Sequence, residues 1–186
     1  MDWRLADHKT LLERKPFAVE ELHIVRTSSG KALPHPYYRL RSVSWVNIFA
    51  ITKAGEALLI RQPRAGAMAD TLEIPGGGVD PGEQPERAAH RELEEETGYV
   101  AGRMRYVGEI SPNPALMTNM LTMFLAEDCV LAAPRKHFPD ATEEIEVLTV
   151  PLAQLDGMIE RGELHNALAN LTILMSQKYV LNRREV

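Results

Sequence analysis

The sequence predicts a mixed α/β sandwich preceded by a small antiparallel β-sheet. Three observations support this: strand-like segments stand on both sides of one helical segment at 86–97, a second helical segment lies near 166–181, and the first 42 residues contain a strand followed by a polar turn. A chain of 186 residues has room for one domain with a core and a small extension. We therefore expect an N-terminal β extension at 1–42 and a main domain at 43–186.

The expected strands are rich in β-branched and aromatic residues and are separated by turn residues. In chain order they are 17–27, 37–41, 43–52, 57–62, 104–110, 120–126 and 145–150. Thr52 to Glu56 (TKAGE) predicts a hairpin turn between two of them. The stretch from residue 63 to residue 85 is dense in glycine and proline, so we expect it to be irregular.

The helix at 86–97 is predicted by strong helix formers and by the absence of glycine and proline, and Gly98 supplies a C-terminal stop. Beyond Pro151 we expect a short helix and a longer one at 166–181. The longer helix has one apolar stripe, formed by Ala167, Leu168, Leu171, Leu174 and Met175.

Composition excludes several classes of protein. Hydrophobic residues make up 45% and charged residues 25%, as in globular proteins. No apolar run reaches the ~18 residues of a membrane helix, so we expect no membrane partner. The single cysteine, Cys129, cannot form an intrachain disulfide, which favours a reducing, cytoplasmic location. The net charge of −5 argues against nucleic acid as a partner.

The negative charge is concentrated in one segment. Residues 77–99 carry 2 basic and 7 acidic groups, and this difference of −5 equals the net charge of the whole chain. On a helix, Glu92, Glu95 and Glu96 fall within an arc of about 100°. Such crowding destabilises an isolated helix by ~0.2–0.5 kcal/mol per like-charged pair. A solvated acidic face is one interpretation; a site for Mg²⁺ or Mn²⁺, which prefer oxygen ligands, is the other.

The residues around these carboxylates form a signature with a fixed spacing. Gly77 is followed after five residues by Glu83, and Arg91-Glu92-Leu93 begins after seven more. One residue then separates Leu93 from Glu95-Glu96, and one more separates this pair from Gly98-Tyr99. No position within the signature departs from the pattern. The chain is therefore similar to Nudix hydrolases over roughly residues 17–180.

This resemblance implies a Nudix α/β/α sandwich that hydrolyses a nucleoside diphosphate linked to another group, with two to three Mg²⁺ or Mn²⁺ ions per site. It assigns Glu92 and Glu96 as the principal metal carboxylates and Glu95 as a further ligand or water contact. The backbone carbonyl of Gly76 would also bind metal. Glu95 and Arg91 are expected among the catalytic residues. Arg91 would pair with Glu83 and fix the loop against the helix.

The flanking segments resemble the ADP-ribose pyrophosphatase branch, which hydrolyses nucleoside diphosphate sugars. The matching segments are Trp45–Asn47, Arg61–Gly66, Glu73–Gly77 and Glu143–Val147. Pro114 lies sixteen residues after Gly98, as is diagnostic of the branch. Pro63 departs from it, because an aromatic residue usually stands there.

In this branch a loop glutamate activates the attacking water, and the resemblance implies Glu143 first and Glu144 second. A glutamate of the signature could serve instead, and both loop residues could equally be solvated surface charges. A general base of this kind contributes ~10²–10⁴-fold to the rate.

Four further residues are expected to bind substrate. Arg64 could contact the diphosphate with its guanidinium fork, or be an ordinary surface arginine. Arg26 could meet substrate phosphates, and Tyr38 could stack on a base, although such aromatics more often lie in a core or interface. Pro114 is expected at the site by resemblance alone. The resemblance also implies a homodimer, in which the N-terminal sheets can exchange between subunits.

ADP-ribose is the first expected substrate, with GDP-mannose or another nucleotide sugar as the alternative. Hydrolysis of a nucleoside triphosphate or dinucleoside polyphosphate is disfavoured by Pro114 and by the N-terminal extension. A non-catalytic nucleotide sensor would usually lack glutamates of the signature, and here all are present. A role in mRNA decapping would need a basic RNA path, for which the net charge gives no support.

Overall fold

The computed structural model describes residues 1–139 and 143–181. The described chain forms two compact units, and the first combines Met1–Ser44 with Ile110–Met120. The second contains Trp45–Glu109 and the chain from Leu121 onward. The sequence did not indicate that residues 110–120 belong with the N-terminal segment. The division into domains at residues 42 and 43 stays a prediction.

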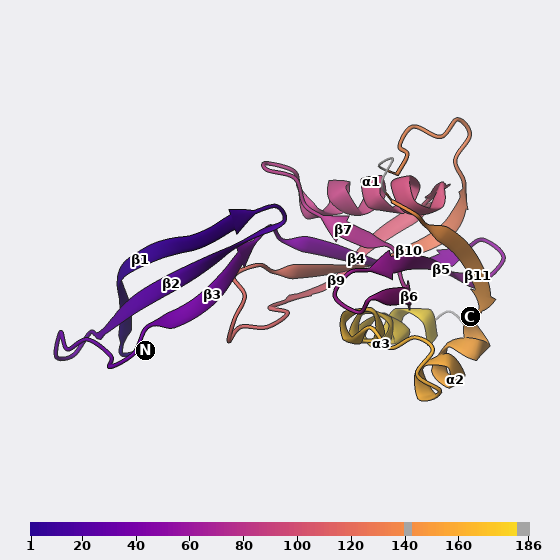
Figure 1. Ribbon diagram of the computed structural model, residues 1–186. Coiled ribbons are helices and arrows are strands. Elements are labelled where there is room, and N and C mark those ends of the chain that lie inside the picture. Colours follow the sequence, from indigo (N-terminus) through magenta and orange to yellow (C-terminus); the bar gives the residue numbers. More distant parts are fainter. Residues whose placement is uncertain (140–142, 182–186) are drawn as a thin grey trace. The chain divides into compact units, whose positions relative to one another are not determined.

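The N-terminal unit is built on a three-stranded antiparallel sheet in the order β1-β2-β3 (Figure 1). Its strands are β1 (Trp3–Arg14), β2 (Phe17–Arg26) and β3 (Tyr37–Ser42). Residues 110–120 join it because Leu40 donates its N–H to Leu116 O at 2.7 Å and Thr118 donates to Leu40 O at 3.1 Å. The expected N-terminal sheet is therefore present.

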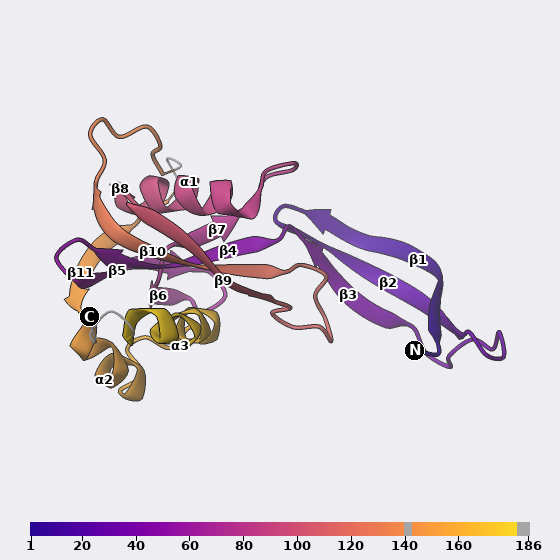
Figure 2. The ribbon, with the colours of Figure 1, turned by 180° about the vertical axis from the view of Figure 1, so that it is seen from behind.

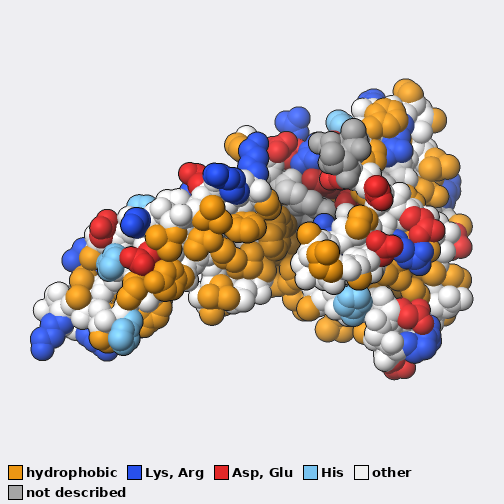
Figure 3. Space-filling model, in the orientation of Figure 1, with side chains coloured by type: hydrophobic (Ala, Val, Ile, Leu, Met, Phe, Trp, Pro, Cys, Tyr) orange, Lys and Arg blue, Asp and Glu red, His pale blue; other side chains and the backbone are white. Residues whose placement is uncertain are grey.

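One strand of this sheet was not expected, and its composition explains why. All twelve residues of β1 are exposed, so its sequence lacks the alternation of apolar and polar residues that marks a half-buried strand. Large apolar side chains on the sheet are exposed as well, among them Trp3, Leu5, Phe17 and Tyr37. Figure 3 shows hydrophobic side chains gathered over this sheet.

The second unit contains a mixed sheet. Within the described residues the sheet has eight strands, in the order β11-β5-β4-β10-β8, with β6 beside β5, β7 beside β4 and β9 beside β10. The strands are β4 (Trp45–Thr52), β5 (Glu56–Arg64), β6 (Ala69–Glu73), β7 (Gly76–Gly78), β8 (Tyr99–Val100), β9 (Arg103–Ile110), β10 (Leu121–Leu131) and β11 (Glu146–Pro151). β10 runs parallel to β4, whereas β4 and β5 are antiparallel.

Helices cover both faces of the mixed sheet (Figures 1 and 2). α1 (Pro85–Thr97) lies on one face, and α3 (Ala167–Leu181) lies on the other, beside η1 (Leu152–Gln154) and α2 (Leu155–Glu160). This arrangement confirms the α/β/α sandwich. The helix predicted at 86–97 is confirmed too, and Gly98 ends it in the left-handed conformation with φ of 74°.

The core beneath α1 fixes the orientation of that helix. Ala88, Ala89 and Leu93 are fully buried against Val46 and Leu58 of the sheet, in the same hydrophobic cluster. Because these residues recur on one side of α1, they determine which side of the helix faces the sheet.

The expectation of an irregular segment at 63–85 was wrong for two stretches. β6 pairs with β5 from Ala69 to Glu73, and β7 pairs with β4 through three consecutive glycines. Glycine-rich composition predicts a loop, but here the absence of side chains lets the backbone approach its neighbours closely. None of the described helices is long and apolar enough to cross a membrane.

Candidate active site

The three clustered glutamates of α1 lie close together beside β7. Glu96 is buried, and the side chains of Glu92 and Glu95 are 13% and 24% exposed. Leu93 anchors the helix in the core from the neighbouring position. The helix therefore holds carboxylates in a largely dehydrated place, which a solvated acidic face would not require.

Burial raises the pKa of Glu92 to about 7 and that of Glu96 to about 8. The Arg91 guanidinium opposes this shift at Glu92, and the N–H of Gly76, which donates to Glu96 Oε2 at 2.8 Å, opposes it at Glu96. Neighbouring carboxylates raise both values further. The two glutamates therefore lack sufficient positive charge to hold them ionised.

Glycine is required where the chain passes these carboxylates. A Cβ added to Gly77 would lie 2.4 Å from the carboxyl carbon of Glu92. A Cβ added to Gly76 would lie 2.3 Å from Val46 O. The glycines of β7 thus allow this strand to pair closely with β4 while the carboxylate of Glu92 lies against it.

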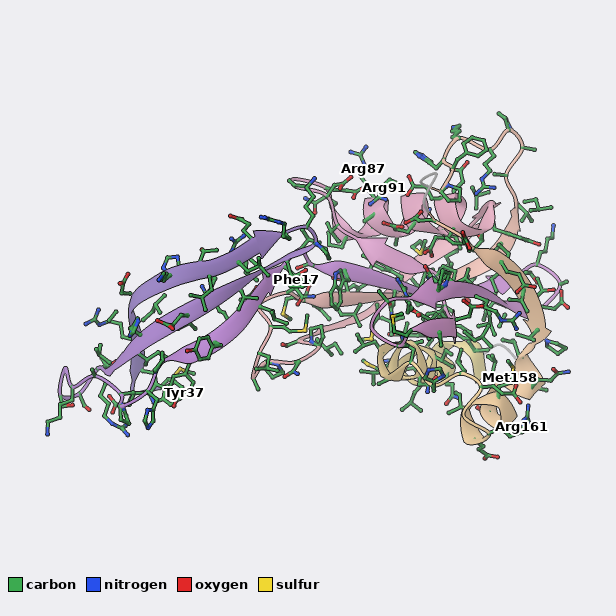
Figure 4. All side chains as sticks on the ribbon, viewed as in Figure 1. Phe17, Tyr37, Arg87, Arg91, Met158 and Arg161 are labelled. Carbon is green, nitrogen blue, oxygen red and sulfur yellow. The ribbon has the colours of Figure 1, made fainter. Side chains whose placement is uncertain are left out.

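Arg91 connects the helix to the loop that precedes it. Its Nε and Nη2 donate to the two oxygens of Glu83 at 3.1 and 2.9 Å, which confirms the predicted pair. Nη2 also donates to Gly78 O, and Nη1 donates to Glu92 and Glu95 at 2.8 and 2.9 Å. Figure 4 shows Arg91 and Arg87 projecting from α1.

The residues present fit a hard divalent cation. Crowded, buried carboxylates with raised pKa values are the oxygen ligands that Mg²⁺ and Mn²⁺ prefer. Among the residues that the structure describes, no three His, Cys, Asp or Glu side chains converge on one ion position. The Arg91 guanidinium donates hydrogen bonds to both Glu92 and Glu95 and so lies between these two carboxylates. Glu92 and Glu96 would hold the ion, while water and substrate oxygens would complete its shell.

The surroundings of the two loop glutamates differ. The charge of Glu143 raises the pKa values of Glu92 and Glu96. Glu144 lines a cavity of about 340 Å³ together with Arg61 and Asp70. Which of the two is the general base stays a prediction. The sequence left the choice between the two residues open.

Arg64 lies at the end of β5, and its guanidinium is held by Glu73 of β6. The hydrogen bonds that Arg64 donates to Glu73 raise the pKa of the guanidinium, and they outweigh burial, which lowers it. The charges of Glu96 and Glu143 also raise it, which places the guanidinium near the carboxylates. The Arg64 side chain is 45% exposed and is held by Glu73, and its contact with the diphosphate stays a prediction.

Three of the predicted substrate contacts belong to the N-terminal unit. Arg26 pairs with Asp2 at 3.3 Å, and the hydroxyl of Tyr38 donates to Glu21 Oε2 at 3.1 Å. Pro114 lies within residues 110–120, the segment that forms hydrogen bonds with Leu40 of β3. Their contact with substrate stays a prediction.

Sequence reasoning missed the contacts at the C-terminal end of α1. Arg135 Nη2 donates to Glu95 O at 2.6 Å, and the N–H of Lys136 donates to the carboxylate of Glu94. The backbone N–H of Lys136 is the main cause that lowers the pKa of Glu94, and the backbone N–H of His137 lowers it further. The acidic Glu94 and the three basic residues at 135–137 were a possible signal of a contact between loop and helix. Their spacing in the sequence, however, does not show that the loop returns to α1.

An α/β/α sandwich with crowded carboxylates on one helix, and glycines that pass close to them, is the arrangement expected of a hydrolase of phosphate anhydrides. The family model described as the NUDIX domain matches residues 41–172. The chain belongs to the Nudix family and is a pyrophosphohydrolase.

Several characterised proteins are similar to this chain. The ADP-ribose pyrophosphatase of Bacillus subtilis (strain 168) is 29% identical over 165 residues, which cover 87% of this chain and 88% of that protein. The GDP-mannose pyrophosphatase of Citrobacter koseri is 31% identical over 115 residues, covering 59% and 60%. A solved structure titled "Crystal structure of ADP compounds hydrolase" has a TM-score of 0.85 at 22% identity, covering 100% of this chain and 98% of the other. This last likeness concerns the fold.

Proposed function

We propose that the protein hydrolyses the pyrophosphate bond of a nucleoside diphosphate sugar, with ADP-ribose as the first candidate. The observation that carries the proposal is the set of buried carboxylates at Glu92 and Glu96, with Arg64 close by. Similarity to an ADP-ribose pyrophosphatase over most of both chains supports this choice of substrate. In the reaction, water adds to one phosphorus and the bridging oxygen leaves, giving a nucleoside monophosphate and a sugar phosphate.

The charge of each site residue determines its proposed role: the glutamates would bind metal ions, and Arg64 would bind phosphate. Glu92 and Glu96 would hold Mg²⁺ or Mn²⁺, two to three ions per site, with Glu95 and the carbonyl of Gly76 as further ligands. When bound, the metal neutralises the diphosphate and lowers the pKa of water. Arg64 would bind a phosphate oxygen. Arg91, by holding Glu83, keeps the glycine loop against α1.

We propose Glu143 as the general base that takes a proton from the attacking water. The charge of Glu143 acts on Glu92, Glu96 and Arg64, and this electrostatic proximity supports the assignment. Glu144 lines the cavity beside Arg61 instead. The assignment therefore ranks Glu143 above Glu144.

A substrate panel tests the proposal. Purified protein with Mg²⁺ would be given ADP-ribose, ADP-glucose, GDP-mannose, UDP-glucose, ATP and a diadenosine polyphosphate, and the products would be identified by chromatography. We expect AMP and ribose 5-phosphate from ADP-ribose, and no turnover with excess EDTA. Cleavage of triphosphates alone would refute the proposal.

GDP-mannose is the second candidate, because the GDP-mannose pyrophosphatase of Citrobacter koseri is 31% identical over 115 residues. The same panel separates the two substrates by kcat/KM. A higher kcat/KM for GDP-mannose would leave the proposed pyrophosphate hydrolysis unchanged and would replace only the base and the sugar assigned to the substrate.

We also propose a homodimer that forms through the N-terminal sheet. Exposed apolar side chains on that sheet support it, including Trp3, Leu5 and Phe17, which are each more than 40% exposed. Arg26, Tyr38 and Pro114 would then stand near a site shared by two subunits. Sedimentation of the purified protein tests the assembly, and a monomer at all concentrations would contradict it.

A further inference from the structure

Arg64 is held by a carboxylate that the proposed chemistry does not use. Its Nε donates to Glu73 Oε1 at 2.8 Å and its Nη2 donates to Glu73 Oε2 at 3.0 Å. This parallel pair occupies one edge of the planar guanidinium. The edge formed by Nη1 and the second hydrogen of Nη2 remains directed away from Glu73 and has the geometry to bind another oxyanion.

Glu73 is itself held from two sides. It is 7% exposed, Thr71 donates its hydroxyl to Oε1 at 2.6 Å, and Asn166 donates Nδ2 to Oε2 at 3.1 Å. Each carboxylate oxygen therefore accepts two hydrogen bonds. These bonds outweigh burial, and the pKa of Glu73 is lowered, so the carboxylate is ionised at neutral pH.

Asn166 links this carboxylate to a helix. Its Oδ1 accepts the N–H groups of Leu168 and Ala169 at 3.0 and 3.1 Å, in the first turn of α3. The same side chain thus caps a helix and fixes Glu73. α3 packs on the sheet through buried residues such as Ile173. The hydrogen bonds that lead from α3 through Asn166 and Glu73 to Arg64 therefore start from a helix that is fixed by packing.

We propose that Glu73 is a positioning residue that presents the outer edge of Arg64 to the diphosphate of the substrate, and that Asn166 holds Glu73 in place from α3. The inference rests on the proposed function, because it takes Arg64 as a diphosphate ligand. It assigns a role to Glu73 and Asn166, which touch Arg64 or each other and not the reacting atoms. Without Glu73, the long arginine side chain would adopt several rotamers, and fixing it again would weaken substrate binding.

A double-mutant cycle on Arg64 and Glu73 tests the proposal. We expect E73Q to raise KM about tenfold with a smaller change in kcat, because the glutamine amide keeps the shape but loses the charged pair. R64A should raise KM at least as much. In the R64A background, E73Q should change KM less than about twofold, because its effect passes through Arg64. E163Q, which breaks the exposed Arg161–Glu163 pair on another part of the unit, is the matched control and should leave KM unchanged.

Two outcomes would overturn the proposal. Glu73 is merely structural if E73Q lowers the melting temperature and leaves KM at the wild-type value. Glu73 acts independently of Arg64 if E73Q raises KM equally with and without R64A.

Substitutions of Asn166 keep the test decisive if E73Q does not fold. N166S retains a side chain that caps helices well but is too short to reach Glu73, so KM should rise about two- to threefold with little loss of stability. N166D also caps α3 but sets a second carboxylate against Glu73, so KM should rise more. Wild-type KM in both variants would contradict the role of Asn166.

Binding of methylenediphosphonate, a hydrolysis-resistant diphosphate, separates this proposal from the proposed function. Calorimetry with Mg²⁺ would compare wild type, E73Q, R64A and the double variant. If wild type hydrolyses no nucleotide sugar, the proposed function fails, yet the same non-additive loss of diphosphate affinity would still support the role of Glu73. Equal affinity of wild type and E73Q would overturn it.

Discussion

Two sets of glutamates within fourteen residues of the chain have opposite electrostatic environments. The carboxylates of Glu83 and Glu94 have lowered pKa values, because Arg91 holds the first and the N–H of Lys136 holds the second. Those of Glu92 and Glu96 have raised pKa values, because both are buried with too few positive partners. Glu94, Glu92 and Glu96 belong to α1, and Glu83 lies in the loop just before it, so the same residue type differs here in its surrounding contacts.

This difference separates carboxylates that stabilise the fold from carboxylates that are available to bind a cation. Glu83 and Glu94 have protein partners that tie loops to α1. Glu92 and Glu96 keep only part of the positive charge that they need, and a bound cation would supply the rest. Substitution of the two sets should therefore have opposite consequences for activity and stability.

The substitutions E92Q and E96Q are expected to have the largest effect, and this effect is on turnover. Each should lower kcat by about 10³–10⁴-fold, since metal ions that neutralise the diphosphate supply several kcal/mol of transition-state stabilisation. Without metal, each variant should melt at the wild-type temperature or above it, because an unfavourable buried charge has been removed. Steady-state kinetics and thermal melts in EDTA measure both effects. E86Q, an exposed glutamate of the same helix, is the control; loss of stability in E96Q without loss of turnover would contradict the assignment.

The next effect concerns Glu143, whose charge raises the pKa values of Glu92 and Glu96. E143Q should lower kcat about 10²–10³-fold, within the range of a general base, and E144Q should change it less than about threefold. The kcat of both variants, measured at several pH values, distinguishes a base from a solvated loop charge. Equal kcat for E143Q and wild type would exclude Glu143 as the base.

The sequence could predict α1 and its carboxylates because their spacing is local. Helical geometry at 100° per residue places Glu92, Glu95 and Glu96 together without knowledge of any other element. The Arg91–Glu83 pair was implied by the resemblance in the same segment and is confirmed.

The remaining contacts depend on strands and loops that local patterns do not reveal. The Arg64–Glu73 pair forms across β5 and β6, and β6 lies in a segment whose glycines and prolines indicated a loop. The choice between Glu143 and Glu144 depends on where the chain enters β11, and not on either neighbour in sequence. β1 was missed because a strand exposed along its whole length has no hydrophobic period.

The third effect is on stability as a function of pH in the absence of metal. A carboxylate with a raised folded pKa binds its proton more tightly in the folded than in the unfolded protein, where its pKa is near 4.5. Its stabilising contribution is therefore complete below about pH 4.5 and is lost as pH rises through about 7 for Glu92 and about 8 for Glu96.

The melting temperature of metal-free wild type, relative to E96Q, should fall by at least about 2–4 °C between pH 5 and pH 9, which corresponds to ~1 kcal/mol in a chain of this size. Saturating Mg²⁺ should remove the fall, because the ion favours the ionised carboxylates. Thermal melts at fixed ionic strength measure the difference. A difference that is independent of pH would mean that Glu96 is not held protonated in the folded protein.

The smallest effect belongs to Glu94, and it is confined to stability. E94A removes the acceptor of the Lys136 N–H, so unfolding in urea should become easier by about 1–2 kcal/mol, whereas E94Q keeps an acceptor oxygen and should lose less. Turnover should fall far less than in E92Q, because Glu94 lies on the side of α1 away from the clustered carboxylates. A loss of kcat in E94A as large as in E92Q would show that the loop at residues 135–137 does more than stabilise α1, and the separation of the two sets of glutamates would not hold.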